Sequence, residues 1–194
     1  MGCRVGKFIG SDALAAVMAA FAAGVKIDAF AYMTVQEYAN SFSTFIEQNK
    51  GAGKKERISE GIKCAVISSS AYGIFISCVM WLFGKELMMI FVNSSETNII
   101  AEGVRYLHIE GTFYFAIGIL FLIYGLYRAL EKPFMSVVLT VISLVSRVLL
   151  AYTLSPIGFI GVKGIWWAIP VGWILADLTG ALYYFKNKNK LLKN

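Results

Sequence analysis

Charged residues interrupt the long apolar stretches of this 194-residue sequence, among them Asp28, Glu37, Glu110, Arg147 and Asp177. A charge inside a hydrocarbon layer costs about 3 kcal/mol or more unless it is paired or hydrated. Carboxyl groups in such positions are the side chains with which membrane proteins bind cations or transfer protons. Function should therefore be sought first at these residues.

The stretch from residue 11 to residue 46 carries the densest set of polar side chains, and helical periodicity divides them between two faces. At about 100° per residue, one face holds Lys26, Glu37, Asn40, Ser41 and Thr44, and another holds Asp28, Tyr32, Gln36 and Ser43. Most other positions are Ala or Gly, which allow close helix packing. Such a helix can line a polar cavity, and Gln36 and Asn40 join the acids as candidate ligands.

Some of these charges have simpler interpretations. Lys26 and Asp28 are merely hydrated if they lie near the outer membrane surface. Glu37 lies about 14 Å from the inner end of the segment. It therefore either lines a cavity or is a protonated acid with a structural role.

Glu110 precedes an uncharged stretch, and Tyr106, His108 and Tyr114 lie close to it in the sequence. Tyr114 is a further candidate ligand for a coupling ion or substrate. A carboxylate at the start of a helix is also well placed against the helix dipole, which is the alternative to a binding role. His108 has no partner at metal-ligand spacing, so we expect no metal site.

Arg147 and Asp177 lie in the last two apolar stretches. Arg147 is about 10 Å from the outer end of its stretch, and Asp177 is about 12 Å from the inner end of its own. A long arginine side chain can bridge that difference in depth. We therefore predict a structural ion pair between them.

The composition indicates an all-α integral membrane protein. Hydrophobic residues make up 58% of the chain and charged residues only 15%, with a mean hydropathy of +0.66. A helix that crosses the hydrocarbon needs roughly 20 mostly apolar residues. We predict about five such helices and a basic tail, at residues 11–46, 64–83, 106–128, 134–154, 164–185 and 186–194. The tryptophans of the last helix are expected in aromatic belts at the two membrane surfaces.

Other classes of function find no support in the sequence. There is no Ser/His/Asp or Cys/His arrangement, so we expect no enzyme and no cofactor. The turn Gly51-Ala52-Gly53 lacks the spacing of a phosphate-binding loop. The net charge of +6 is explained by cationic loops that orient the helices rather than by nucleic-acid binding.

The distribution of Lys and Arg predicts the orientation. Eleven lie in residues 47–63, in 128–132 and in the tail, which share one side if every segment crosses once. Five lie on the other side. The positive-inside rule then places the C-terminus in the cytoplasm and the N-terminus outside. An N-terminus outside, with no signal peptide, leads us to expect that at least one helix precedes this chain.

Several motifs, in order along nearly the whole chain, resemble the multidrug and toxic compound extrusion (MATE) family. The first is EQNKGAGKKERISEGI at residues 47–62, which follows a long helix rich in small residues. The others are YLHIEG at 106–111, YGLYRA at 124–129 and GIWWAIP at 164–170.

The resemblance implies a twelve-helix transporter of two lobes, of which this chain is the last five helices of the second lobe. It implies a secondary antiporter of the plasma (inner) membrane that exports small hydrophobic or cationic molecules in exchange for Na⁺ or H⁺. In the family an acidic residue of a lobe helix couples efflux to that ion, and Glu110 is the best candidate for it here. Its expected partners are the lipid bilayer and the missing N-terminal lobe. The alternative is a non-transporting remnant, or an assembly partner of a separate first-lobe polypeptide.

Overall fold

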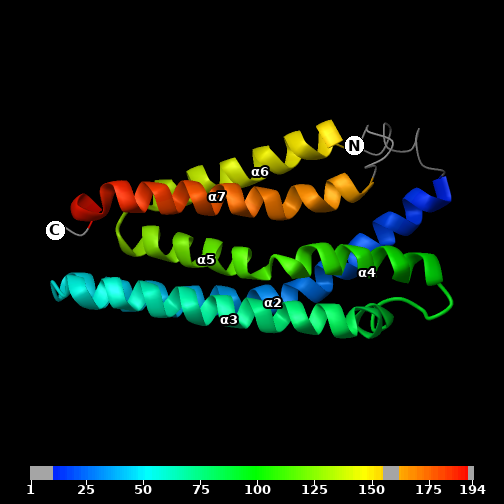
Figure 1. The fold of residues 1–194 in the computed structure, drawn as a ribbon, viewed down its shortest axis with the longest axis horizontal. Coiled ribbons are helices and arrows are strands. Elements are labelled where there is room, and N and C mark those ends of the chain that lie inside the picture. Colours follow the sequence, from blue (N-terminus) through cyan, green and yellow to red (C-terminus); the bar gives the residue numbers. More distant parts are fainter. Residues whose placement is uncertain (1–10, 155–161, 192–194) are drawn as a thin grey trace.

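The computed structural model describes residues 11–154 and 162–191, and six helices make up this part of the chain (Figure 1). They are α2 (Ser11–Gly51), α3 (Lys55–Met89), α4 (Thr97–Thr112), α5 (Tyr114–Ala129), α6 (Pro133–Leu154) and α7 (Val162–Leu191). The described ranges contain no strand, so the predicted all-helical fold is confirmed. The predicted start at residues 1–10 and the loop at 155–161 lie outside the described residues.

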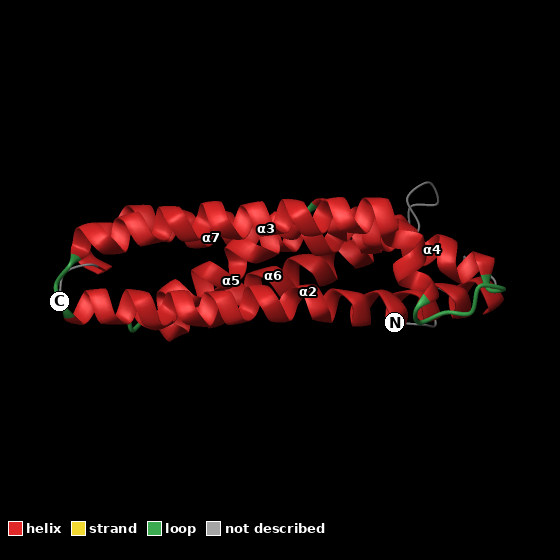
Figure 2. Ribbon diagram, turned by 90° about the horizontal axis from the view of Figure 1, so that it is seen from below, coloured by secondary structure: helices red, strands yellow, loops and turns green. Residues whose placement is uncertain are grey.

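The helices lie lengthwise in an elongated bundle with α5 at its centre. Figure 1 shows α6 and α7 along one side, α4 and α5 in the middle and α3 along the other, while α2 lies behind α3 at one end and crosses behind α4 towards its N-terminal end. Figure 2 shows the same lengthwise bundle from below. The helix α5 packs against α2, α3, α6 and α7. Ten of its sixteen residues are buried, whereas many large apolar residues of α3 and α6 are exposed. An exposed apolar surface of that kind is what helices in contact with lipid present.

Four of the helices are each long and apolar enough to cross a membrane, namely α2, α3, α6 and α7. The pair α4 and α5 forms a fifth span if the two are counted as one, with a bend of 54° between them. About five membrane-crossing helices were predicted, and this number is confirmed. The third of them is broken rather than continuous.

The break between α4 and α5 lies at Phe113, where the backbone leaves the helical region (φ −111°, ψ 17°). A side chain of α3 stabilises it, since the hydroxyl of Ser77 donates a hydrogen bond of 2.5 Å to the carbonyl of Gly111. Gly73 of α3 brings the two backbones together, because a Cβ there would lie 2.7 Å from the backbone of Phe115. The helix α3 thus supplies a hydrogen-bond donor to one carbonyl beside the break, and the space for the close approach of the backbones.

Several predicted boundaries were wrong. The helix α3 begins at Lys55 and ends at Met89, so most of the polar stretch 47–63 is helical and only residues 52–54 form the turn. Gly53 in that turn has a φ of +67°, which glycine adopts at little cost. The helix α7 continues to Leu191, so the tail predicted from residue 186 is largely helical. Polar, helix-favouring residues such as Lys and Glu extend a helix beyond the apolar part that signals a span.

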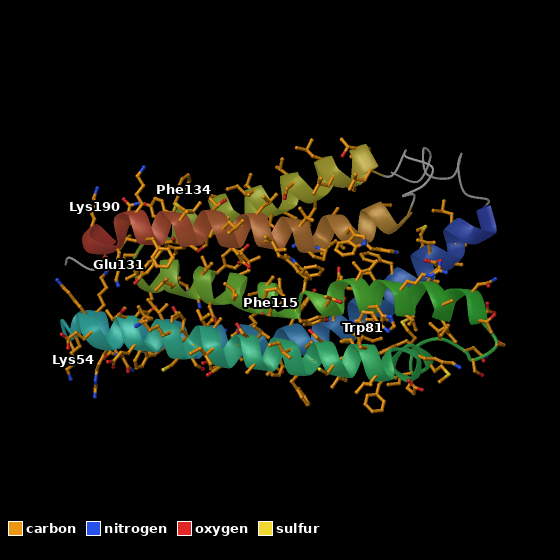
Figure 3. The ribbon with its side chains drawn as sticks, viewed as in Figure 1. Lys54, Trp81, Phe115, Glu131, Phe134 and Lys190 are labelled. Carbon is orange, nitrogen blue, oxygen red and sulfur yellow. The ribbon has the colours of Figure 1, made fainter. Side chains whose placement is uncertain are left out.

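The most basic regions of the chain lie at one end of the bundle. Figure 3 shows Lys54, Glu131 and Lys190 at the same end, although they come from three different parts of the sequence. Lys50 at the end of α2 pairs with Glu131 at 2.9 Å, which links the two turns there. The shared side predicted for these three regions therefore agrees with the arrangement of the helices.

Candidate functional site

Two buried carboxyl groups meet in the middle of the bundle, Asp28 of α2 and Glu110 of α4. Each residue is only 1% exposed. Tyr32, one turn from Asp28 on α2, donates to Glu110, and Tyr106, one turn from Glu110 on α4, donates to Asp28, so the two carboxyl groups share one site. Asp28 is therefore not a surface residue hydrated at the membrane boundary, as one interpretation of the sequence allowed. Glu110 lies in the last turn of α4 rather than at a helix start, so a helix dipole does not account for it.

Three tyrosine hydroxyls surround the carboxylate pair. Tyr106 donates to Oδ2 of Asp28 at 2.5 Å, and Tyr114 donates to Oδ1 of the same residue. Tyr32 donates to Oε2 of Glu110 at 3.4 Å. We call these five residues the carboxylate–tyrosine cluster.

Helical spacing explains how the cluster assembles. Asp28 and Tyr32 are four residues apart on α2, and Tyr106 and Glu110 are four residues apart on α4, so each pair shares a helix face. Tyr114 is the first residue of α5, just after the break. The bend at the break thus lets a third element add its hydroxyl to the same carboxyl group.

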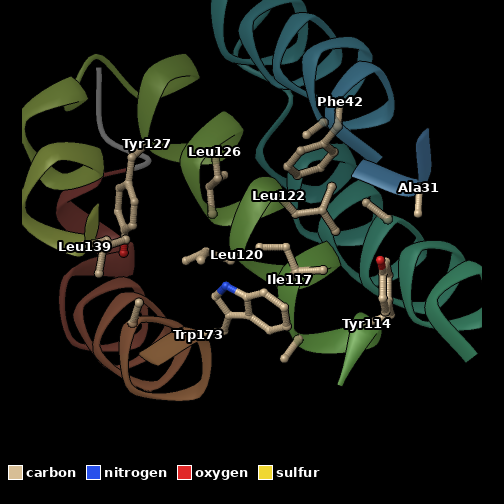
Figure 4. Close-up of a cluster of buried hydrophobic side chains, with 14 of the residues drawn as sticks. Ala31, Phe42, Tyr114, Ile117, Leu120, Leu122, Leu126, Tyr127, Leu139 and Trp173 are labelled. Carbon is tan, nitrogen blue, oxygen red and sulfur yellow. The ribbon is translucent and has the colours of Figure 1, made fainter. Parts of the chain in front are cut away.

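Aromatic rings enclose the cluster. Tyr106 packs against Phe21 and Trp166, with ring centroids 5.6 and 5.0 Å apart. On the other side, Tyr32 meets the ring of Trp173 edge to face at 6.3 Å. Figure 4 shows Trp173 of α7 lying against α5. Trp166 and Trp173 are 3% and 1% exposed, so the prediction of an aromatic belt at the membrane surface was wrong for these two. For Trp167, which is exposed, it stays a prediction.

The chemistry of this arrangement is that of a cation or proton site. Two carboxylates this close, away from water, repel each other. Uptake of a proton or a cation lowers that electrostatic repulsion. Carboxylate and phenol oxygens are hard ligands of the kind that alkali cations prefer. In the described part of the chain there is no group of three or more His, Cys, Asp or Glu residues suited to a metal ion.

The other predicted ligands lie elsewhere. Glu37, Gln36 and Asn40 are two to three turns further along α2, and the first two are exposed. Asn40 accepts a hydrogen bond from Arg128 at 2.8 Å and donates one to Glu37 at 3.5 Å. Of the six candidate ligands, the structure brings together Asp28, Glu110 and Tyr114. Gln36, Glu37 and Asn40 lie outside this cluster.

The predicted ion pair between Arg147 and Asp177 is absent. No salt bridge among the described residues joins them, and neither Nε of Arg147 nor Oδ1 of Asp177 has a hydrogen-bond partner. The guanidinium group lies instead over the ring of Trp173, 5.4 Å from its centroid. The depth argument allowed the contact, but the Arg147 side chain packs against Gly172 of α7 and forms no salt bridge with Asp177.

Tyr32 and Tyr106 were not predicted as ligands. The sequence did contain a signal, because each lies one helical turn from a buried acid. A phenol at that spacing is equally common as core packing, so only the meeting of α2 and α4 distinguishes the two cases.

Comparison with known proteins identifies the family to which this geometry belongs. The family model described as MatE matches residues 3–153. The chain belongs to the MatE family. This confirms the resemblance seen in the sequence motifs, and it makes the chain a multi-pass membrane protein of a transporter family.

Two curated relatives of this MatE chain are transport proteins by name. It is 27% identical over 179 residues to "Probable multidrug resistance protein YpnP" of Bacillus subtilis (strain 168), covering 91% of the chain and 39% of the relative. It is 25% identical over 173 residues to "FAD transporter" of Shewanella oneidensis MR-1, covering 88% and 37%. The chain thus spans about two fifths of the length of the curated relatives it matches.

Two solved structures share the fold of this MatE chain. One is an outward-facing conformation of a multidrug resistance MATE family transporter of the MOP superfamily (TM-score 0.87, 18% identity). The other is a MOP superfamily transporter from Pyrococcus furiosus, described with a binding pocket of reverse polarity (TM-score 0.86, 18% identity). In each case the match covers 98% of this chain and 42% of the other.

Proposed function

We propose that this chain forms the cation-coupling part of a secondary antiporter, and that Asp28 and Glu110 together bind the coupling ion. The observation that carries the proposal is the meeting of these two buried carboxyl groups with three tyrosine hydroxyls. Buried acids of this kind inside membrane helices are retained for ion and proton pathways.

The coupling step follows from the electrostatics of the pair. Uptake of Na⁺ or H⁺ reduces the repulsion between Asp28 and Glu110, so the state of the transporter that holds the cation is favoured when the cation is present. A ligand shifts a conformational equilibrium only by its difference in affinity for the two states. The break between α4 and α5 lies beside Tyr114, so a change at the cluster can act on the angle between these helices.

For the exported substrate we propose small hydrophobic or cationic molecules. One curated relative is named for multidrug resistance and the other for FAD, which is an anion. The substrate path therefore differs within the family, whereas a buried acid can serve the coupling ion in either case. We propose a location in the plasma (inner) membrane with the basic end of the bundle, including the C-terminus, in the cytoplasm.

The expected partners are lipid and an N-terminal lobe that completes the substrate path. The alternative of a non-transporting remnant or assembly partner predicts that no efflux depends on the cluster. It is not favoured, because both curated relatives carry names of transport or resistance proteins.

The test is efflux of ethidium from cells or vesicles that contain the protein in its full natural length, driven by an imposed Na⁺ or H⁺ gradient. Glu110→Gln should lower the coupled efflux at least tenfold, because the pair loses one charge and one ligand. Glu37→Gln is the matched control, since Glu37 is a second acid within a span but lies outside the cluster. Unchanged coupled efflux in Glu110→Gln would refute the proposal.

A further inference from the structure

Arg147 of α6 brings a positive charge to the edge of the carboxylate–tyrosine cluster. Its guanidinium group lies 5.4 Å from the ring centroid of Trp173, whose edge-to-face contact with Tyr32 has a centroid distance of 6.3 Å. Tyr32 in turn donates to Glu110. Successive contacts through the rings of Trp173 and Tyr32 thus connect Arg147 to the carboxyl group of Glu110.

The helix α7 holds Arg147 in this place. Gly172 leaves the space that the side chain occupies, because a Cβ at this position would lie 2.7 Å from Cγ and 3.0 Å from Nε of Arg147. The carbonyl of Ser143 approaches the same glycine, so α6 and α7 are closely packed there. The arginine is therefore directed along α7 by packing rather than by a salt bridge.

No carboxylate pairs directly with Arg147 among the described residues. Asp177, the acid of α7 that was expected to pair with it, makes no salt bridge, and Nε of the arginine has no hydrogen-bond partner. The titratable and charged groups around it from the packed helices are Tyr32, Tyr106, Glu110, Tyr124 and Asp177. A partly buried charge inside a membrane helix needs a counterion, and the contacts through Trp173 and Tyr32 lead from Arg147 to Glu110.

We propose that Arg147 is a built-in countercharge of the cation site, and this proposal rests on the proposed function of Asp28 and Glu110. With both carboxyl groups ionised, the pair and Arg147 together carry one net negative charge. A single monovalent cation then completes neutrality. Arg147 also weakens the hold on that cation, which an antiporter must release in every cycle.

The proposal predicts that replacing Arg147 raises the affinity for the cation instead of lowering it. If Arg147 were only a packing residue, its replacement would loosen the site and weaken cation binding. As a countercharge, its removal leaves two negative charges with no internal compensation. The cation is then held more tightly, by about tenfold for a unit charge acting across a partly screened interior.

The test is equilibrium binding to the full chain reconstituted in lipid nanodiscs, with two probes. The first is ²²Na⁺, and the second is the proton, followed by the infrared band of protonated carboxyl groups during a pH titration. Arg147→Gln should tighten binding of the probe that wild type binds by about tenfold, whereas Arg147→Lys should stay near wild type. Arg105→Gln is the matched control, because Arg105 is exposed and pairs with Glu102 on the outer side of α4.

If Arg147→Gln does not fold, Arg147→Met removes the same charge but keeps an unbranched side chain against Gly172, and it should tighten binding likewise. The double variant is a separate test of the net charge. Asp28→Asn should weaken binding, and adding Arg147→Gln should restore it towards wild type because the net charge of the site returns to minus one. Equal or weaker binding in Arg147→Gln, or no restoration in the double variant, would overturn the countercharge. If Glu110→Gln binds both probes as wild type does, or wild type binds neither, the proposed function itself fails, and the countercharge fails with it.

Discussion

The ring of Tyr106 lies directly on the backbone of Gly24, one helical turn before Asp28. A Cβ at residue 24 would lie 2.5 Å from two carbon atoms of that ring. The short contact brings α2 and α4 together at the point where Tyr106 donates to Asp28. Glycine is needed here for the close approach of two helices rather than for an unusual backbone angle.

Gly24→Ala should therefore displace Tyr106 and open the cluster. We expect a loss of about 1–3 kcal/mol in stability, as in other overpacked interiors, together with weaker cation binding. Thermal unfolding in detergent measures the first effect, and ²²Na⁺ or proton binding measures the second. Gly51→Ala is the control, because nothing lies within 4 Å of a Cβ there. Equal behaviour of the two variants would contradict the role of the contact.

Tyr114→Phe removes one of the two hydroxyls that Asp28 accepts while it keeps the ring. A hydrogen bond to a charged group contributes about 1.5–3 kcal/mol, so we expect cation affinity to change by at least fivefold. The measurement is the same binding titration. Tyr38→Phe is the matched control, since Tyr38 is an exposed tyrosine of α2 outside the cluster. A Tyr114→Phe affinity equal to that of the control would show that this hydroxyl does not act on the site.

The membrane-crossing helices could be predicted from the sequence because a run of about twenty mostly apolar residues is typical of a membrane-spanning helix. Asp28 and Glu110 could be predicted for a related reason. An acid inside a membrane helix costs free energy, so such residues are few. Their meeting could not be predicted. It depends on the packing of α2 against α4 at Gly24. The sequence does not distinguish this glycine, because glycine and alanine are frequent along the whole of α2.

The break at Phe113 and the position of Arg147 were also beyond the sequence. No proline marks the break in the sequence near Phe113, and the bend is stabilised by Ser77 and Gly73 of another helix. Arg147 and Asp177 have depths that allow a contact, but depth says nothing of direction around the helix axis. Gly172 decides that direction by leaving room for the arginine on α7.

The absence of an ion pair between Arg147 and Asp177 predicts independent effects of their substitution. Asp177→Asn should be tolerated or slightly stabilising, because an amide of the same shape replaces a buried acid whose Oδ1 has no partner. In a double-mutant cycle with Arg147→Gln, the coupling energy should stay below about 0.5 kcal/mol. Unfolding of the four proteins in detergent measures it. A coupling of several times that value would restore the ion pair that the sequence suggested.

The contact between Lys50 and Glu131 gives a prediction for the basic end of the bundle. The hydrogen bond from the Lys50 ammonium group at 2.9 Å, and then its charge, hold the pKa of Glu131 below the usual value of 4.5. A carboxyl group whose pKa is lowered by folding stabilises the fold above its unfolded pKa, and that contribution is lost as the pH falls through the folded pKa. The contact is therefore present at neutral pH and disappears only in acid, below about pH 4.5.

Lys50→Gln should return the pKa of Glu131 towards 4.5, because both the donor and the charge are removed. The ¹³C chemical shift of the Glu131 carboxyl group, followed from pH 7 to pH 3, measures this change. Lys54→Gln should leave this pKa where it is in wild type, since Lys54 lies at the same end of the bundle as Glu131 (Figure 3) but forms no salt bridge with it. Because Glu131 is fully exposed, the pKa should also rise in wild type when salt screens the lysine. A titration that neither salt nor Lys50→Gln shifts would show that the two turns are not held together by this pair.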